Sequence, residues 1–150
     1  MKIGIACDHA GFEYKEKLLP LLEKKGFEPV DFGTHSADSC DYPDFAHPLG
    51  EAIDKGELEL GISLCGSGNG IAMTLNKHPK VRAALCWDPE LAKLAKAHNN
   101  ANVLSLPARF ISFKAAVKIL EAWLETSFEG GRHLRRINKI PLGQSLGEQA

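Results

Sequence analysis

Short apolar runs alternate along the chain with longer segments in which apolar residues recur every three to four positions. The short runs predict five strands, at residues 2–7, 28–32, 60–64, 82–86 and 103–106. The runs at 60–64 and 103–106 are almost continuously apolar, which is typical of strands that are covered on both faces. The pattern therefore predicts a sheet that lies between layers of helices.

The longer segments predict five helices, at residues 12–25, 42–55, 68–76, 89–97 and 112–125. The last has the clearest periodicity, because apolar pairs begin at Ala115, Ile119 and Trp123. Pro20 interrupts the first of these segments and should kink that helix or end it early.

Alternating strands and helices favour a parallel sheet with helices on both faces. We predict a single α/β domain over residues 1–150, a three-layer α/β/α sandwich with a Rossmann-like five-stranded parallel sheet. The expected strand order is 2-1-3-4-5, which reverses between the first and third strands. Ligands of such sheets bind at the carboxyl ends of the strands beside the reversal.

Composition and charge exclude several classes of protein. A net charge of −1 argues against a protein built chiefly to bind nucleic acid. No run of about 18 apolar residues predicts a membrane span, and the first residues form a strand pattern rather than a signal peptide. The four cysteines show no Cys-x-x-Cys spacing, so we expect free thiols and a cytoplasmic protein.

The third predicted strand leads directly into a loop of small residues: Cys65, Gly66, Ser67, Gly68, Asn69 and Gly70. Glycines let several backbone N–H groups approach an anion, and a helix N-terminus lowers the pKa of a nearby thiol. The loop therefore offers a base or nucleophile together with a cradle for negative charge. The plain alternative is a tight turn beside an incidental buried cysteine.

Well-known phosphate-binding motifs do not fit this loop. A P-loop ends in Gly-Lys-Ser/Thr and a Cys-x5-Arg phosphatase needs an arginine, whereas here Gly70 is followed by Ile71. The glycine spacing also differs from a dinucleotide fingerprint, although Asp88 lies at about the right distance to bind a ribose hydroxyl. A nucleotide- or phosphate-binding module without catalysis therefore remains an alternative.

Two pairs of polar residues follow predicted elements directly. Asp8 and His9 come after the first strand, at the predicted reversal, where a turn or helix cap is the plain alternative. His98 and Asn99 end the fourth helix, where such residues often serve as caps. We expect this second pair to lie at the same end of the sheet as Cys65.

A basic cluster follows the fifth helix. Arg132 and Arg136 are four positions apart and would share one face of a helix, where two guanidinium groups suit a phosphate. The alternatives are a solvated basic tail or a weak nucleic-acid patch. His35 and His47 lack metal-ligand spacing to other histidines, cysteines or paired carboxylates, so we predict no metal site.

Taken together, these residues resemble the type B ribose-5-phosphate isomerases, within the wider family that includes galactose-6-phosphate isomerase subunits. The resemblance extends from the first strand to about residue 137. It rests on these stretches: Ile5-Ala6-Cys7-Asp8-His9-Ala10-Gly11, Asp41-Tyr42-Pro43, Cys65-Gly66-Ser67-Gly68-Asn69-Gly70, Asn76-Lys77, His98-Asn99-Asn100-Ala101-Asn102-Val103 and Glu129-Gly130-Gly131-Arg132-His133.

The resemblance implies an aldose–ketose isomerase of the pentose phosphate pathway that uses no metal or cofactor. It would convert ribose 5-phosphate to ribulose 5-phosphate through a cis-enediolate. Cys65 would be the base, with Ser67 beside it, and His98 would open the sugar ring with Asp8 near the sugar oxygens. Residues that would bind the substrate are Asp8, His9, Gly66, Ser67, Gly68, Asn69, Gly70, Asn99, Arg109, Arg132 and Arg136.

The resemblance further implies a homodimer or a dimer of dimers with shared active sites, and residues 128–150 are expected to reach the partner subunit. Many family members have Thr where this chain has Ser67, and the hydroxyl is kept. Another branch uses Glu at the position of Ile71, which leaves Cys65 as the base here. A six-carbon substrate, allose or galactose 6-phosphate, stays an alternative.

Overall fold

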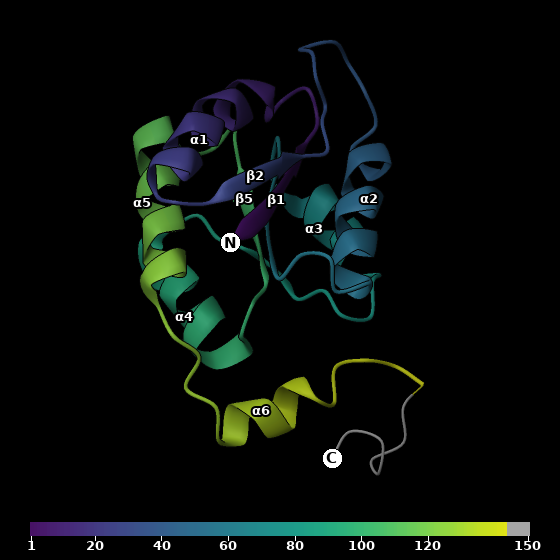
Figure 1. Ribbon diagram of the computed structural model, residues 1–150, viewed down its shortest axis with the longest axis vertical. Helices are drawn as coiled ribbons and strands as arrows, with labels where there is room; N and C mark the ends of the chain where they lie inside the picture. The colour runs from purple at the N-terminus through teal and green to yellow at the C-terminus, as the bar shows by residue number, and fades with distance from the viewer. Residues whose placement is uncertain (144–150) are drawn as a thin grey trace.

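The computed structural model describes residues 1–143. Its five parallel strands are β1 (Lys2–Cys7), β2 (Glu28–Asp31), β3 (Leu60–Cys65), β4 (Ala83–Leu85) and β5 (Val103–Pro107). The helices of the described residues are α1 (Phe12–Lys24), α2 (Pro43–Asp54), α3 (Asn69–Leu75), α4 (Pro89–Asn99), α5 (Phe113–Glu125) and α6 (Arg132–Ile137). The predicted α/β class and parallel sheet are confirmed (Figure 1).

The strands lie in the order β2-β1-β3-β5-β4. The predicted reversal between β1 and β3 is therefore confirmed, but the order of the last two strands is wrong. Every residue of β5 is buried, whereas the three residues of β4 are half-buried. A continuously apolar strand suits the interior of the sheet and a short, partly exposed strand suits its edge.

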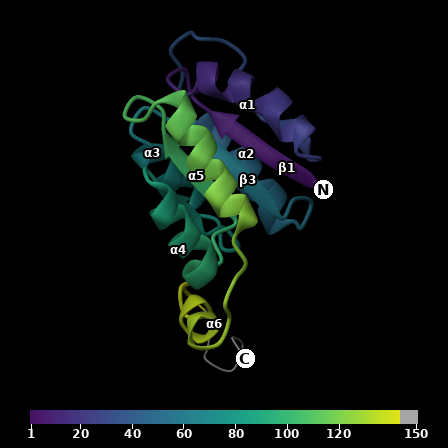
Figure 2. The same ribbon diagram turned by 90° about the vertical axis from the view of Figure 1, so that its left-hand side faces the viewer.

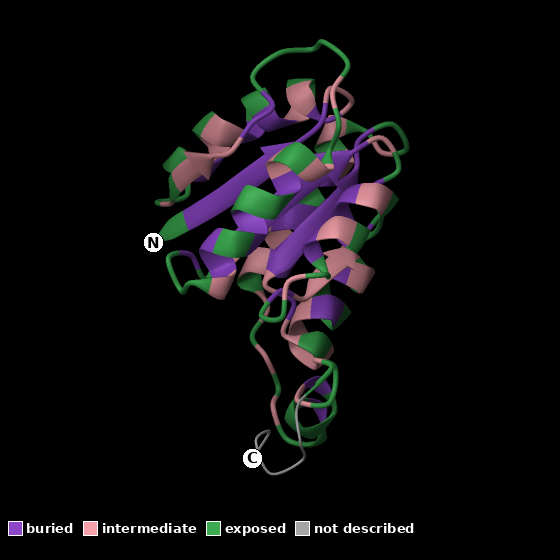
Figure 3. Ribbon diagram, turned by 90° about the vertical axis from the view of Figure 1, so that its right-hand side faces the viewer, coloured by how far each residue is buried: buried purple, intermediate pink, exposed green. Residues whose placement is uncertain are grey.

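The helices form two layers, one on each face of the sheet. Helices α1, α4 and α5 cover one face and enclose a core that includes Leu18, Ile119 and Trp123 (Figures 1 and 2). Helices α2 and α3 cover the other face over a second core that includes Leu49 and Ile71. Figure 3 shows the strands largely buried between these layers, which confirms the three-layer sandwich.

Two helix ends differ from the prediction. Helix α1 continues through Pro20 to Lys24, so the expectation of an early end is wrong. Leu18 and Leu22 on either side of the proline are fully buried, and this packing stabilises the helix despite the missing N–H. Helix α4 extends to Asn99, two residues beyond the predicted end. Asn100 caps it with a φ of 45°, a left-handed conformation that asparagine tolerates.

His98 and Cys65 lie at opposite ends of the sheet, contrary to the prediction. Cys65 ends β3, whereas helix α4 returns the chain to the edge where β5 begins. There the carbonyl of Asn102 accepts a 2.9 Å hydrogen bond from the N–H of Gly61, near the start of β3. Five residue steps along β3 separate the two edges by about 17 Å.

Helix α6 belongs to the edge where the strands begin. The N–H of Glu129 donates a 3.0 Å hydrogen bond to the carbonyl of Ala97, which fastens the segment before α6 to the end of α4. Figures 1 and 2 show α6 beyond that end of α4, set apart from the rest of the fold. Arg132 and Arg136 both lie in this helix, which the periodicity did not predict, and both are exposed.

Candidate active site

The carboxyl ends of β1 and β3 bring Asp8 and Cys65 together. Both side chains are buried, at 7% and 5% exposure. The carboxylate of Asp8 accepts hydrogen bonds from the N–H groups of Ala10 (2.9 Å) and Gly11 (3.2 Å), so it also caps the turn after β1. Its negative charge acts on the Cys65 thiol. Asp8 therefore stabilises the turn and also lies at the thiol.

The loop after Cys65 depends on the absence of side chains at its glycines. Gly68 has a φ of +78° and precedes α3; a Cβ there would lie 2.4 Å from the side chain of Leu85. Gly70 packs under the ring of Tyr42, and a Cβ there would lie 2.4 Å from that ring. Ser67 is exposed, and its hydroxyl accepts a 3.3 Å hydrogen bond from the N–H of Asn69. Glycine at these two positions thus lets the backbone approach its neighbours more closely than a residue with a Cβ atom would.

The expected low pKa of the Cys65 thiol is not observed. Burial raises the pKa above its ordinary value and the charge of Asp8 raises it further, while hydrogen bonds from the backbone of Ile71, Gly68 and Gly70 lower it. Backbone N–H groups of the loop thus reach the sulfur, but burial outweighs their effect on the pKa. In the single chain the thiol is mostly protonated at neutral pH.

Cys7 and Cys86 are free thiols of a different kind. Burial raises the pKa of Cys7 to about 12 and that of Cys86 to about 11. Both side chains lie within the core between the sheet and helices α1, α4 and α5. These two thiols fill space in the interior and are chemically inert at neutral pH.

His9 and Arg109 complete this edge of the sheet. The Nδ1 atom of His9 accepts a 3.2 Å hydrogen bond from the N–H of Cys40, which ties the loop after β2 to the end of β1. The N–H of Arg109 donates to the carbonyl of Gly66 at 3.0 Å, and its side chain packs beside that glycine. The predicted residues that the structure brings together here are Asp8, His9, Cys65, Gly66, Ser67, Gly68, Asn69, Gly70 and Arg109.

An internal ion pair supports the loop that reaches His9. The ammonium group of Lys15 is fully buried and lies 2.7 Å from the carboxylate of Asp31, which also accepts a 2.9 Å hydrogen bond from the N–H of Gly33. Burial alone would lower the pKa of Lys15, but the hydrogen bonds to Asp31 and Glu16 outweigh it and raise the pKa. The pair fixes the point at which this loop leaves β2.

A second group of predicted residues lies at the opposite edge, where the strands begin. His98 pairs with the carboxylate of Glu129 at 3.3 Å, and its ring stacks on that of His133 with centroids 4.3 Å apart. Burial and the charge of Arg132 lower the pKa of His133. The carbonyl of Asn99 accepts a 3.1 Å hydrogen bond from Arg82 Nε. The predicted residues at this edge are His98, Asn99, Arg132 and Arg136.

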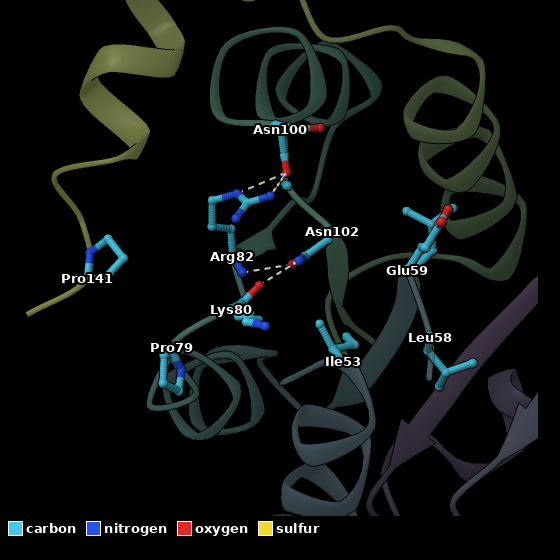
Figure 4. Close-up of a pocket in the computed structure, with 11 residues that line it drawn as sticks. Ile53, Leu58, Glu59, Pro79, Lys80, Arg82, Asn100, Asn102 and Pro141 are labelled. Atoms are coloured by element: carbon cyan, nitrogen blue, oxygen red, sulfur yellow. Dashed lines mark hydrogen bonds between the residues drawn. The ribbon is translucent and has the colours of Figure 1, made fainter. Parts of the chain in front are cut away.

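The same edge contains an open cavity of about 580 Å³ (Figure 4). In it, the guanidinium of Arg82 donates to the carbonyl of Asn100 at 2.9 Å, while the side chain of Asn102 bonds the backbone of Lys80 and Arg82. These contacts fasten the start of β4 to the turn after α4. Arg82 and Asn102 therefore serve the fold, and the cavity contains none of the proposed acid–base residues.

Sequence reasoning missed several neighbours of the predicted residues. Tyr42 covers Gly70, and its only signal in the sequence is its place in the Asp41-Tyr42-Pro43 motif. Cys40 reaches His9 from a loop without periodicity. Glu129 and His133 contact His98 across a distance in sequence that no local pattern indicates.

A family model described as ribose/galactose isomerase matches residues 3–140. The chain belongs to the ribose/galactose isomerase family. It is 40% identical over 139 residues to ribose-5-phosphate isomerase B of Escherichia coli K12, with 93% of each chain covered. No helix within residues 1–143 is long and apolar enough to cross a membrane.

Solved structures agree with this membership of the ribose/galactose isomerase family. Ribose-5-phosphate isomerase B of Clostridium thermocellum superposes with a TM-score of 0.92 and 44% identity, covering 93% of this chain and 95% of that one. The Mycoplasma genitalium enzyme, solved with bound ribulose 5-phosphate, has a TM-score of 0.90 and 43% identity, with 93% of each chain covered. The fold and its sequence thus match the family over nearly the whole described chain.

Proposed function

We propose that this chain is an aldose–ketose isomerase that interconverts ribose 5-phosphate and ribulose 5-phosphate in the pentose phosphate pathway. The observation that carries the proposal is the position of the Cys65 sulfur, which lies among backbone N–H groups at the end of β3. The chain's membership of the ribose/galactose isomerase family supports it. The relative solved with ribulose 5-phosphate supports the choice of a five-carbon substrate.

In the proposed reaction the Cys65 thiolate removes the proton from C2 of the open-chain aldose. The electron pair moves toward the aldehyde and forms a cis-enediolate. A proton passes from O2 to O1, and the thiol returns its proton to C1 as the carbonyl forms at C2. N–H groups of the loop at 66–70 stabilise the developing oxyanion, with the Ser67 hydroxyl beside the thiol. No metal or cofactor takes part in the proposed mechanism.

Several residues proposed for ring opening and phosphate binding lie away from Cys65 in the single chain. His98 suits the first task, because an imidazole can both donate a proton to the ring oxygen and accept one from a sugar hydroxyl. Arg132 and Arg136 suit the phosphate, but both lie with His98 at the far edge of the sheet. We propose that they serve the Cys65 of a second copy, in a homodimer or a dimer of dimers.

The remaining phosphate ligands are proposed from the edge that contains Cys65. His9 and Arg109 lie beside the loop at 66–70 and would meet Arg132 and Arg136 of the second copy around one phosphate. Asn99 would bind a sugar hydroxyl next to His98. The four free thiols fit a reducing compartment, and we propose that the enzyme acts in the cytoplasm.

A coupled assay across five- and six-carbon aldose phosphates, run in excess EDTA, tests this function. We expect turnover of ribose 5-phosphate to exceed that of allose or galactose 6-phosphate. Preference for a six-carbon aldose phosphate would contradict the proposed substrate but would leave the proposed aldose–ketose isomerisation standing. No turnover at all would favour the alternative of a non-catalytic nucleotide- or phosphate-binding module. The candidate ribose ligand of that module, Asp88, instead caps α4 by accepting a 2.8 Å hydrogen bond from the N–H of Glu90.

A further inference from the structure

His98, Glu129 and His133 form a compact cluster at the edge where the strands begin. One ring nitrogen of each histidine and one carboxylate oxygen all lie within 4.8 Å of one another. The three side chains come from the end of α4, the segment before α6, and α6 itself. Imidazole and carboxylate are ligands that Zn²⁺ and similar divalent cations accept together.

A second observation points to a ligand at this cluster. The Nε2 atom of His133 is buried and has no hydrogen-bond partner, and it is the sole buried side-chain nitrogen or oxygen in that state among the described residues. An unpaired buried polar atom of this kind costs about 1–3 kcal/mol. Folded chains rarely leave such an atom unpaired unless something else binds it.

We propose that His98, Glu129 and His133 bind a divalent cation of the Zn²⁺ class, and that the bound cation inhibits the enzyme. A tetrahedral Zn²⁺ with bonds of about 2.1 Å separates its ligand atoms by about 3.4 Å. Each pair in the cluster must therefore close by at most about 1.5 Å. Three protein ligands leave the fourth position open to water or to a substrate oxygen.

The arrangement of the two rings indicates which side chain moves. The imidazole planes differ by only 10°, so their nitrogens cannot both aim at one ion while the rings stay stacked. The His133 side chain is buried, whereas the side chains of His98 and Glu129 are 38% and 53% exposed. The His98 ring therefore turns to meet the ion, and Glu129 follows it.

The inhibition rests on the proposed function of His98. Ring opening requires a lone pair or proton on the imidazole, and a cation on that nitrogen removes both. The guanidinium groups of Arg132 and Arg136 act on His133 electrostatically and oppose a nearby cation. The site is thus suited to reversible inhibition and not to permanent retention of a metal.

Calorimetric titration of the full chain with Zn²⁺ tests the site directly. We expect one ion per chain at this cluster, and both Glu129→Gln and His133→Asn to weaken binding at least about tenfold, because loss of an outer partner already costs about that much. Glu125→Gln, an exposed carboxylate at the end of α5, should leave affinity unchanged. Glu129 is exposed, so its variant tests the site even where the His133 variant fails to fold.

Co²⁺ distinguishes this cluster from the cysteines. The cluster predicts a Co²⁺ spectrum without a thiolate charge-transfer band, and loss of the spectrum in Glu129→Gln. A thiolate band that persists in Glu129→Gln, or equal affinity in Glu129→Gln and the parent, would overturn the proposal.

Activity then separates the site from the proposed reaction. We expect Zn²⁺ to inhibit ribose 5-phosphate turnover, EDTA to restore it, and Glu129→Gln to raise the inhibitory concentration by the same factor as the dissociation constant. Binding that depends on Glu129 without inhibition would overturn the inhibitory role. A metal-free protein that turns over no sugar phosphate would instead contradict the proposed function and leave the binding result standing.

Discussion

The two edges of the sheet carry two different kinds of site. At the carboxyl edge, Cys65 and Asp8 are buried and the surrounding donors are backbone groups held by β3 and α3. At the opposite edge, His98 on α4 is half-exposed, and Arg132 and Arg136 on α6 are long, exposed side chains. In the proposed function the first edge supplies the base and the amides that act on the sugar carbons, and the second edge supplies the groups that reach a partner. The proposed set of groups is therefore divided between the two edges.

Removing the proposed base, Cys65, should produce the largest effect. We expect Cys65→Ala to lower turnover of ribose 5-phosphate on the order of 10³-fold, the usual scale for losing a general base. The buried Cys86, on the other side of the sheet, offers a matched thiol, and Cys86→Ala should keep near-normal turnover. Steady-state kinetics with circular dichroism as a folding check measure both, and near-normal turnover in Cys65→Ala would contradict the assignment.

Distorting the amide cradle should have the next largest effect. Gly68→Ala places a Cβ against Leu85 at a φ of +78°, which should displace loop amides and lower turnover on the order of 10²-fold. Gly56 has a φ of +76° with nothing within 4 Å of a Cβ. Gly56→Ala therefore carries the same backbone strain without touching the site. Equal activity losses in the two variants would attribute the effect to strain alone.

The fold was largely predictable, because its signals are local. Periodicity located all five strands, and the alternation of elements predicted the parallel sheet; the reversal between β1 and β3 belongs to the expected Rossmann-like order and is observed. The relative positions of β4 and β5 could not be predicted, since strand order depends on how completely each strand is buried in the finished sheet. Pro20 does not end α1, because the packing of Leu18 and Leu22 outweighs the local preference of proline; the alternative of a kink stays a prediction.

The gathering of Asp8 and residues 65–70 at the carboxyl edge was predictable for the same reason, since residues 65–70 are consecutive and Asp8 follows a strand at the reversal. Two properties of the candidate site could not be predicted. The raised pKa of Cys65 depends on burial, which competes with the amides and wins. The place of His98 depends on the direction of α4, and its contacts with Glu129 and His133 join segments about thirty residues apart.

The opposite edge should respond differently from the edge that contains Cys65. Arg136→Ala removes one proposed phosphate ligand, so we expect KM for ribose 5-phosphate to rise about tenfold with a smaller change in kcat. Arg135 is the adjacent exposed residue of α6 and serves as the control, because Arg135→Ala removes the same charge from another face. Equal increases in KM would indicate a general effect of charge and no specific phosphate contact.

The smallest expected effect concerns the thiol itself. Asp8 raises the pKa of Cys65, so Asp8→Asn should lower that pKa while the amide oxygen still accepts the turn hydrogen bonds. Alkylation requires the thiolate, and its rate should therefore begin to rise at a lower pH in the variant. Mass spectrometry of the Cys65 peptide after iodoacetamide treatment measures this shift, with the exposed Asp38→Asn as control. A shift to higher pH would contradict the account.

In the proposed dimer, the two edges form one active site only between two copies of the chain. Cys65→Ala and His98→Asn should each be inactive as pure proteins. Random mixing of subunits places both defects in one site of a mixed dimer and leaves the other site intact, so activity should recover to about a quarter of the parent value. Activity of the mixture after demonstrated subunit exchange is the most direct measurement. Recovery near a quarter is the predicted result, and no recovery would show that each chain carries its own complete site.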